Sequence, residues 1–297
     1  MRIAHIILAH KNPEQLSRLI KRLSHDSFDF YIHLDKKISL EGFEALGNLN
    51  NVSFIKNRVK CNWGGNSLSR GILSSIEEVV KSGRNYDFFN LISGQDYPIV
   101  SANDIYSYFE NKKGFNYISY DEDKNSEWNK LASRRYDKYH FTDFNFKAKY
   151  FFERIFNLLT PKRKFPSSFE VFGGSKASWW TISGDCASDI LVIYKENPKL
   201  GNFLKYCWGT DELIIPTLIL NSKHKSKTIN DNLRYIDWSE GNAHPKMLGI
   251  EDYEKIKSSD NLFARKFDLD FDYTILDKID ISIKESEKLN INNNNEN

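Results

Sequence analysis

Short apolar runs alternate with amphipathic stretches over residues 1–120. The apolar runs, which predict β-strands, cover residues 2–9, 28–35, 52–56, 86–93 and 115–120. Between them, residues 67–81 have the apolar spacing of a helix, and Asn12-Pro13 and Ser101 with Asp104 are typical helix starts. This alternation predicts an α/β protein with a largely parallel sheet flanked by helices.

Polar residues follow three of the predicted strands. They are His10, Asp35-Lys36-Lys37 and Gly94-Gln95-Asp96. Parallel strands place their carboxyl ends at one edge of the sheet, and folds of this kind bind ligands there. We therefore expect these side chains to meet in a ligand site.

The middle and the end of the chain depart from this pattern. Residues 121–168 are charged and aromatic, and we interpret them as an insertion within a single domain covering residues 1–282. After the insertion, residues 169–282 predict a strand at 179–183, helices at 185–195 and 211–220, and extended chain at 227–238. Residues 283–297 end in an asparagine-rich run, and we expect them to be a disordered tail.

Composition narrows the class of protein. The net charge of +2 argues against a dedicated nucleic-acid binder. Aromatic residues make up 14% of the chain, which suits sugar binding, although composition alone favours their use in a large core. The three cysteines are widely spaced without a C-x-x-C pair, which is typical of a reducing compartment. The first apolar run is too short to span a bilayer, so we expect a cytoplasmic protein.

Residues 130–164 are strongly basic, with ten Lys and Arg against three acids and aromatic residues in between. One interpretation is a solvated helix face over a core, and composition favours it. The other is a surface that contacts anionic lipid or a lipid-phosphate acceptor, which includes peripheral contact with the inner membrane surface.

Several catalytic motifs are absent from the sequence. It contains no Gly-x-Gly-x-x-Gly, P-loop, Gly-x-Ser-x-Gly or His-Glu-x-x-His pattern, which argues against the classes of enzyme that depend on them. Acidic runs at residues 121–123 and 268–272 have the composition of divalent-cation ligands. Such runs are a weak pattern in a chain with 40 acids, so we interpret both as solvated turns and predict no metal site.

Glu212 is the candidate catalytic carboxylate. It follows Thr210 and Asp211, either of which could cap a helix that continues through Leu213. A helix N-terminus would keep such a carboxylate ionised. A single carboxylate that takes the proton of an attacking hydroxyl is enough for a displacement with inversion. Read alone, Glu212 fits this role and the role of a plain capping acid equally well.

Cations near the end of the chain could bind a phosphate group. Arg265 and Lys266 are adjacent between apolar anchors, and Lys246 follows His244-Pro245. Fixed cations can neutralise the charge of a departing diphosphate where no metal does so. Neighbouring residues on an extended segment point to opposite faces. We therefore expect only one of Arg265 and Lys266 to face the phosphate and the other to pair with an acid.

Taken together, these segments resemble glycosyltransferase family 14. That family includes the core-2/I-branching β-1,6-N-acetylglucosaminyltransferases and the peptide O-xylosyltransferases. The matching strings are Ala9-His10-Lys11, Ile32-His33-Leu34-Asp35-Lys36, Trp63-Gly64-Gly65 with Ser67, Asn90-Leu91-Ile92-Ser93-Gly94-Gln95-Asp96-Tyr97-Pro98-Ile99, Phe172-Gly173-Gly174-Ser175, Asp211-Glu212 and Leu262-Phe263-Ala264-Arg265-Lys266-Phe267-Asp268. They occur in order across residues 4–99 and 170–276, and the middle of the chain matches poorly.

The resemblance implies a GT-A-like fold and an inverting transfer from a UDP-sugar that requires no divalent metal and no other cofactor. The most favoured donor is UDP-N-acetylglucosamine, and UDP-xylose is the alternative. By position, Glu212 would be the base. Lys266, helped by Lys246 and Arg265, would hold the diphosphate.

The resemblance also implies the remaining contacts. The residues at the nucleotide end would be His10, Asp35, Lys36, Trp63 and Gly64. The floor under donor and acceptor would be formed by Gly94, Gln95, Asp96, Gly174, Ser175 and Asp211. The acceptor side would use Arg134, Arg135, Trp180 and Trp238.

The chain also departs from its animal counterparts in that family. Those enzymes are membrane-anchored and rich in disulfides, and we expect neither feature in this chain. It therefore looks like a bacterial member that builds a surface glycan on the inner side of the membrane. An inactive carbohydrate-binding protein of the same fold is a second hypothesis. A glycoside hydrolase using Asp211 and Glu212 is disfavoured, because neighbours on a helix diverge by about 100° and cannot easily flank one bond.

Overall fold

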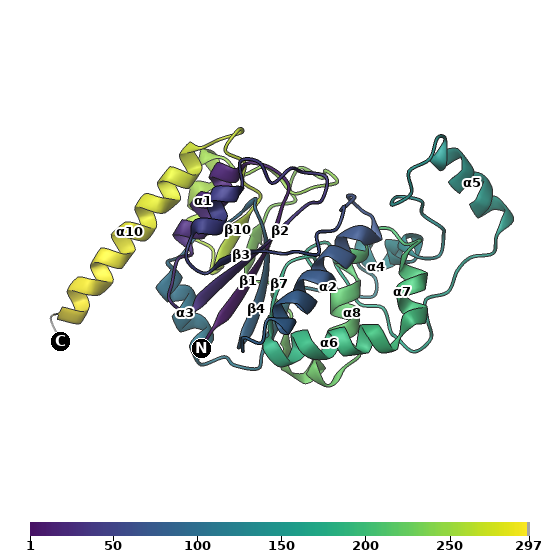
Figure 1. Cartoon of the computed structure of the whole chain (residues 1–297), viewed down its shortest axis with the longest axis horizontal. Helices are drawn as coiled ribbons and strands as arrows, with labels where there is room; N and C mark the ends of the chain where they lie inside the picture. The colour runs from purple at the N-terminus through teal and green to yellow at the C-terminus, as the bar shows by residue number, and fades with distance from the viewer. Residues whose placement is uncertain (296–297) are drawn as a thin grey trace.

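The computed structural model describes residues 1–295, and residues 296–297 lie outside the described part of the chain. At its centre is a seven-stranded sheet with the order β3-β2-β1-β4-β7-β6-β8 (Figure 1). Its strands are β1 (Ile3–Ala9), β2 (Phe28–Leu34), β3 (Val52–Phe54), β4 (Phe88–Ser93), β6 (Asn116–Ile118), β7 (Trp180–Ser183) and β8 (Thr228–Ile229). β7 is antiparallel to β4 and β6, and the other pairs are parallel. The predicted α/β class with a mostly parallel sheet is confirmed.

A smaller sheet begins where β4 ends. It has the order β5-β10-β9, and its strands are β5 (Asp96–Pro98), β9 (Arg234–Ile236) and β10 (Phe263–Arg265). β10 is antiparallel to β5 and parallel to β9, and Arg265 lies opposite Asp96. This sheet brings Arg265 and Lys266 to the carboxyl edge of the central sheet.

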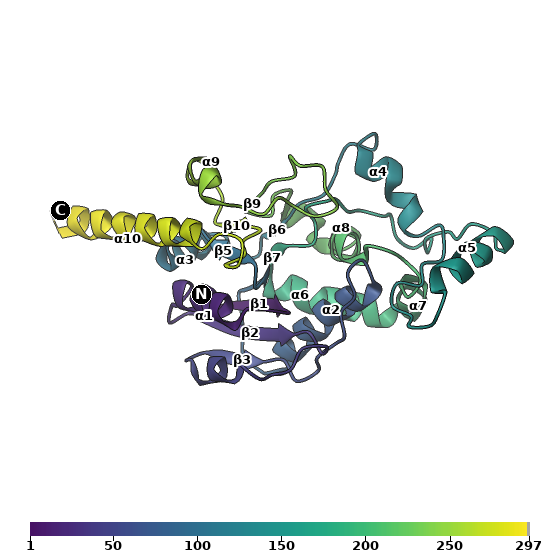
Figure 2. The same cartoon turned by 90° about the horizontal axis from the view of Figure 1, so that it is seen from above.

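Helices cover both faces of the central sheet (Figures 1 and 2). The α-helices are α1 (Pro13–Arg22), α2 (Asn66–Lys81), α3 (Ala102–Glu110), α4 (Glu127–Ala132), α5 (Lys149–Leu159), α6 (Gly184–Glu196), α7 (Pro198–Leu204), α8 (Ile214–Leu220), α9 (Tyr253–Lys257) and α10 (Thr274–Asn295). The 3₁₀ helices are η1 (Glu44–Asn48), η2 (Ser133–Arg135), η3 (Thr210–Glu212), η4 (Lys223–Lys227) and η5 (Ile250–Asp252). Along β1, Ile3 and Ile7 pack towards α1, α3 and α10, whereas Ala4 and Ile6 pack towards α2, α6 and α8. This alternation with a period of two residues is what a sheet buried on both faces requires.

The two predicted helix starts are confirmed. The side chain of Asn12 accepts a hydrogen bond from the backbone N–H of Gln15 (3.0 Å), one turn into α1. Ser101 and Asp104 form a reciprocal capping box at the start of α3. Both caps satisfy backbone donors that a helix end leaves unpaired.

The expected disordered tail is wrong for most of its length. Residues 283–295 continue α10, and residues 296–297 lie outside the described residues. Ile275, Leu276, Ile279 and Ile283 form one buried stripe on this helix and pack into the same core as α1 and α3. The apolar stripe therefore reaches Ile283, the first residue of the segment that composition alone assigned to disorder.

The predicted helix over residues 211–220 is divided. Thr210–Glu212 forms the short 3₁₀ helix η3, and α8 begins only at Ile214. Thr210 does not cap α8, because its hydroxyl lies 2.6 Å from the hydroxyl of Ser69 on α2. Glu212 therefore lies before α8 and not in its first turn.

Candidate active site

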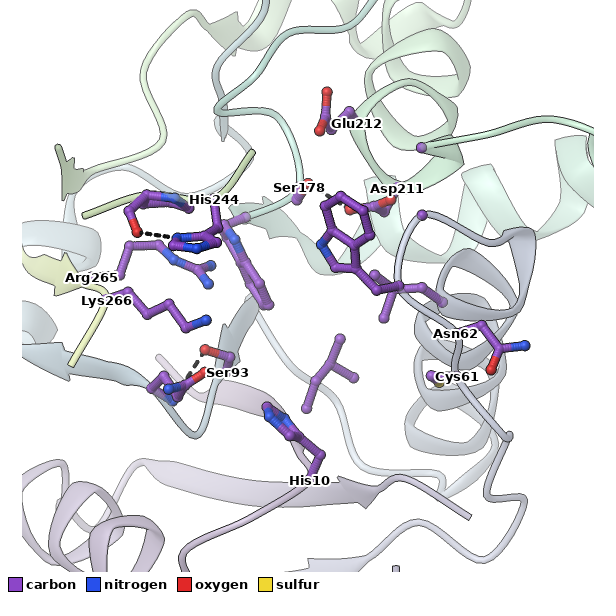
Figure 3. Close-up of a pocket in the computed structure, with 18 of the residues that line it drawn as sticks. His10, Cys61, Asn62, Ser93, Ser178, Asp211, Glu212, His244, Arg265 and Lys266 are labelled. Atoms are coloured by element: carbon purple, nitrogen blue, oxygen red, sulfur yellow. Dashed lines mark hydrogen bonds between the residues drawn. The ribbon is translucent and has the colours of Figure 1, made fainter. Parts of the chain in front are cut away.

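A cavity of about 450 Å³ opens at the carboxyl ends of the parallel strands (Figure 3). His10 follows β1, Asp35 follows β2, and Ser93 ends β4, and all three line it. Its size is typical of small-molecule sites, which range over about 300–1,000 Å³. The prediction that polar residues of separate strands meet at this edge is confirmed for His10, Asp35, Lys37 and Gln95, whereas Lys36, Gly94 and Asp96 do not line the cavity.

Two cations form one wall of the cavity. Arg265 is buried and forms an ion pair with Asp96 at 3.4 Å, and its guanidinium lies over the ring of Trp179, 4.0 Å from the centroid. Its Nη1 is buried without a hydrogen-bond partner in the described part of the chain. Lys266 lines the cavity, and among residues 1–295 it has no ion-pair partner. As expected, one of the two neighbours pairs with an acid, although both line the cavity.

The charge at this wall is concentrated enough to change pKa values. Burial, followed by the nearby Arg265 and Lys11, lowers the pKa of Lys266. Burial, followed by Lys266 and Lys11, also lowers the pKa of His10. Because these cations destabilise one another, an anion bound between them would relieve the repulsion.

Lys246 does not reach the cavity. Its ammonium pairs with Asp252 (2.6 Å) and Glu251 (3.5 Å), and the bond to Asp252 raises the pKa of Lys246. The expectation that it assists Lys266 is wrong for this structure. His244 and Pro245, which precede it in the chain, line the cavity instead.

Glu212 lines the cavity (Figure 3) and contacts Trp128 of α4. Its Oε2 pairs with Arg135 Nη2 (2.8 Å) and accepts a hydrogen bond from Trp128 Nε1 (3.0 Å). Within the described residues its Oε1 has no hydrogen-bond partner, and the side chain is 20% exposed. One carboxylate oxygen is thus fixed, and the other is available to a ligand.

Burial raises the pKa of Glu212, and the Arg135 guanidinium opposes this effect. The predicted source of stabilisation, a helix N-terminus, is wrong because α8 starts after Glu212. Arg135 therefore provides the positive charge beside the carboxylate that was expected from the helix dipole.

Asp211 lies on the same turn and also lines the cavity. Its Oδ2 accepts a hydrogen bond from Ser178 Oγ (2.8 Å), and burial raises the pKa of Asp211. Figure 3 shows Asp211 and Glu212 entering the cavity from a different side than Arg265 and Lys266. The site thus has an acidic side and a basic side.

The expected nucleotide end is partly assembled. Trp63 and Gly64 line the cavity, and Gly64 has a left-handed backbone with a φ of 70°. A Cβ on Gly64 would collide with the indole of Trp208, so this close packing needs glycine.

Lys36 is exposed and does not line the cavity, whereas Lys37 does. The backbone N–H of Lys37 bonds to the Asp35 carboxylate (2.9 Å) in a tight turn, and the Lys37 ammonium lies 3.3 Å from the same group. The turn after β2 therefore points Lys37 at the site in place of Lys36.

The expected floor is divided into lining and supporting residues. Gln95 and Ser175 line the cavity, whereas Gly94, Asp96 and Gly174 do not. Asp96 lies beneath Arg265, and the N–H of Gly174 bonds to the backbone oxygen of Glu212 (3.2 Å). Asp96 and Gly174 thus hold the catalytic candidates in place and do not face a ligand.

The acceptor-side expectations are the least well matched. Trp180 is fully buried in β7 and cannot contact an acceptor, and its neighbour Trp179 lines the cavity in its place. Trp238 lines the cavity as expected, and its buried Nε1 lacks a hydrogen-bond partner in the described chain. Arg134 is exposed and outside the cavity, while Arg135 acts on Glu212.

Carboxylates of both acidic runs already have partners within the protein. Asp268 pairs with Lys11, and Asp272 caps the start of α10 at Thr274. Asp121 accepts a hydrogen bond from Ser126. Over residues 1–295, no group of three or more His, Cys, Asp or Glu is arranged to hold a metal ion.

Fold and site together define an α/β protein with a cavity at the strand ends, lined by cations on one side and carboxylates on the other. The family model described as "Branch: Core-2/I-Branching enzyme" matches residues 3–259. The chain therefore belongs to the Core-2/I-Branching enzyme family, in agreement with the resemblance read from its motifs.

The chain is also similar to characterised glycosyltransferases, at about a quarter of identical residues. Xylosyltransferase 2 of Rattus norvegicus is 25% identical over 95% of this chain, and beta-glucuronosyltransferase GlcAT14B of Arabidopsis thaliana is 27% identical over 94%. The chain spans 34% of the length of the first and 65% of the second. Among solved structures, the alignment with mouse xyloside xylosyltransferase 1 covers 89% of this chain and 96% of the mouse chain. The sequence identity is 10% and the TM-score is 0.39. No helix within residues 1–295 is long and apolar enough to cross a membrane.

Proposed function

We propose that this chain transfers a sugar from a UDP donor to a hydroxyl group with inversion at the anomeric carbon, with Glu212 as the base. The observation that supports this best is the position of Glu212 Oε1. It lacks a protein partner among the described residues, and the Glu212 side chain lines a cavity whose other wall holds Lys266 and Arg265. A proton acceptor and an anion site therefore share one space.

The proposed step is a single displacement. The acceptor oxygen attacks the anomeric carbon while its proton passes to Glu212 Oε1, and the bond from that carbon to the donor phosphate breaks. UDP leaves with the electron pair, and Lys266 and Arg265 stabilise the charge that develops on the diphosphate. One carboxylate is enough, because no covalent sugar intermediate forms.

We further propose that this reaction needs no divalent metal. Its support is the basic wall itself, where the side chains of Lys266 and Arg265 both line the cavity and supply the positive charge that a diphosphate needs. Binding of UDP should then be unchanged by EDTA. Binding that appears only when Mg²⁺ or Mn²⁺ is added would contradict the proposal.

The family resemblance favours N-acetylglucosamine as the donor sugar, with xylose as the alternative, and the relatives' names add glucuronic acid. The acceptor we propose is a glycan under assembly for a bacterial cell surface. The three cysteines are free, which supports a cytoplasmic, reducing site for the reaction. A thermal-shift screen of the three UDP-sugars and UDP, with and without EDTA, tests donor and metal together.

The decisive variant is Glu212→Gln. Loss of a general base typically costs about 10²–10⁴-fold in rate, so transfer should fall by that factor while UDP affinity is retained. Glu127→Gln is the matched control, because Glu127 is an exposed acid one residue before Trp128. If Glu212→Gln folds and keeps full turnover, Glu212 is not the base.

A further inference from the structure

Helix α5 presents polar side chains to the protein. Asn157 accepts a hydrogen bond from the Tyr139 N–H and donates one to the Tyr139 carbonyl, both at 2.7 Å. Glu153 accepts a hydrogen bond from the backbone N–H of Phe141 (2.7 Å). Asn157 lies one helical turn after Glu153, so the two define one face of α5, and that face is attached to the preceding loop.

The opposite face of α5 is apolar and exposed. Phe151, Leu158 and Leu159 are 61%, 77% and 80% exposed, and Phe152 and Ile155 beside them are also exposed. A helix of a globular protein normally turns its apolar face to the core and its polar face to water. The pattern of α5 is inverted, and the helix extends away from the rest of the molecule (Figures 1 and 2). An exposed apolar surface of this kind is typical of a site that binds another protein or a membrane.

The charge around this face is strongly positive. Residues 144–164, which we call the α5 arm, contain six Lys and Arg and one acid, Glu153, which faces inward. Lys147, Arg154 and Lys164 are exposed and form no ion pair within the described residues. Lys162 pairs with Asp137 (3.4 Å), so the arm carries at least these three exposed cations without a counter-charge among the described residues.

We propose that the α5 arm docks on the surface of an anionic lipid bilayer. Exposed Phe and Leu can enter the boundary between head groups and acyl chains, while the surrounding Lys and Arg contact anionic head groups. A second copy of the chain fits less well. A two-fold contact would bring the same unpaired cations of both copies together without an acid between them.

The arm is attached to the rim of the cavity. Asp143, at its base, accepts hydrogen bonds from the N–H of Ser67 (2.7 Å) and from the side chain of Asn62 (3.1 Å). Asn62 lines the cavity, so a docked arm would hold the cavity rim close to the bilayer. Resting on the proposed function, this inference identifies the acceptor class as a glycan carried on a membrane lipid.

Cosedimentation of the full chain with vesicles tests this proposal. We expect binding to phosphatidylcholine vesicles that contain phosphatidylglycerol, weaker binding at high salt, and little binding to phosphatidylcholine alone. The double variant Leu158→Gln/Leu159→Gln should lower partitioning by roughly tenfold or more, because it removes two exposed apolar anchors. The control is Ile281→Gln/Leu289→Gln, which makes the same type of change at exposed positions of α10.

Three results would overturn the proposal: no vesicle binding, equal binding to neutral and anionic vesicles, or equal loss of binding in the α10 control. Sedimentation velocity without vesicles provides a further check. If Leu158→Gln/Leu159→Gln instead converts a dimer to a monomer, the face is a self-contact and the proposal is wrong. UDP binding separates the two proposals, since vesicle binding by a chain that does not bind UDP contradicts only the transferase.

Discussion

At Glu212, burial and the Arg135 guanidinium act in opposite directions on the pKa of the carboxyl group, and burial is the larger effect. A base works only when ionised, so activity should be lost as the pH falls through this raised pKa. The acid limb of kcat/KM should therefore lie above about 4.3, the ordinary value for Glu.

Lys266 should determine the basic limb of the dependence of kcat/KM on pH. It must be protonated to hold a diphosphate, and burial lowers its pKa. Binding should thus be lost as the pH rises through that lowered pKa, at a pH below the ordinary lysine value of about 10.4. The pH range over which kcat/KM is high should therefore be narrower than the range between the ordinary pKa values of Glu and Lys. Measuring kcat/KM against pH checks this, and an acid limb at or below the ordinary Glu value would contradict the assignment.

For two site residues, the sequence predicted the residue type but not the position. The motifs placed an aromatic residue and a lysine at the site but selected Trp180 and Lys36, whereas Trp179 and Lys37 line the cavity. Trp179 directly precedes β7, and Lys37 lies in the turn after β2, where its N–H bonds to Asp35. Which of two neighbours faces the cavity there depends on the turn geometry and on packing against segments far away in sequence. The pattern therefore locates such a residue only to within one position.

At the scale of elements, the end of β10 and the 3₁₀ helix η5 determine which cations line the cavity. Lys266 follows β10 into the cavity, whereas Lys246 is held by Asp252, which is almost fully buried. Lys266→Met should weaken UDP binding by about tenfold or more, because it removes a charged hydrogen-bond donor. Calorimetric titration of UDP measures this effect.

Lys246→Met is the matched comparison. It should leave UDP affinity unchanged and lower the free energy of unfolding by about 1–3 kcal/mol, because Asp252 loses its buried partner. Equal loss of UDP affinity in both variants would show that Lys246 moves into the site when the ligand binds. The assignment made from the structure would then fail.

Elements with a clear period were predicted well, and those set by distant contacts were not. The strands β1, β2 and β4 and the caps at Asn12 and Ser101 follow from local pattern and local hydrogen bonds. The division of η3 from α8 depends on Ser69 of α2, which holds Thr210 out of the helix. No local signal reports a contact of that kind.

At the scale of the whole molecule, the contacts of α10 define how far the packed core extends towards the C-terminus. Arg18 and Arg22 of α1 both pair with Asp280 of α10, and Tyr97 donates to the same carboxylate. Ile283, beyond this cluster, is 3% exposed, while Ile281 on the same helix is 52% exposed. The core thus reaches into the segment for which composition indicated a loose tail.

Ile283→Ala should lower the free energy of unfolding by about 2–5 kcal/mol, the usual cost of removing a buried Ile side chain. Ile281→Ala should change it by less than about 0.5 kcal/mol, as surface substitutions do. Both variants gain the same helix propensity, so their difference reports burial alone. Urea unfolding measured at equilibrium gives the comparison. Equal and small effects would mean that α10 is not packed beyond Asp280 in solution, and the core would then end where the asparagine-rich composition first suggested.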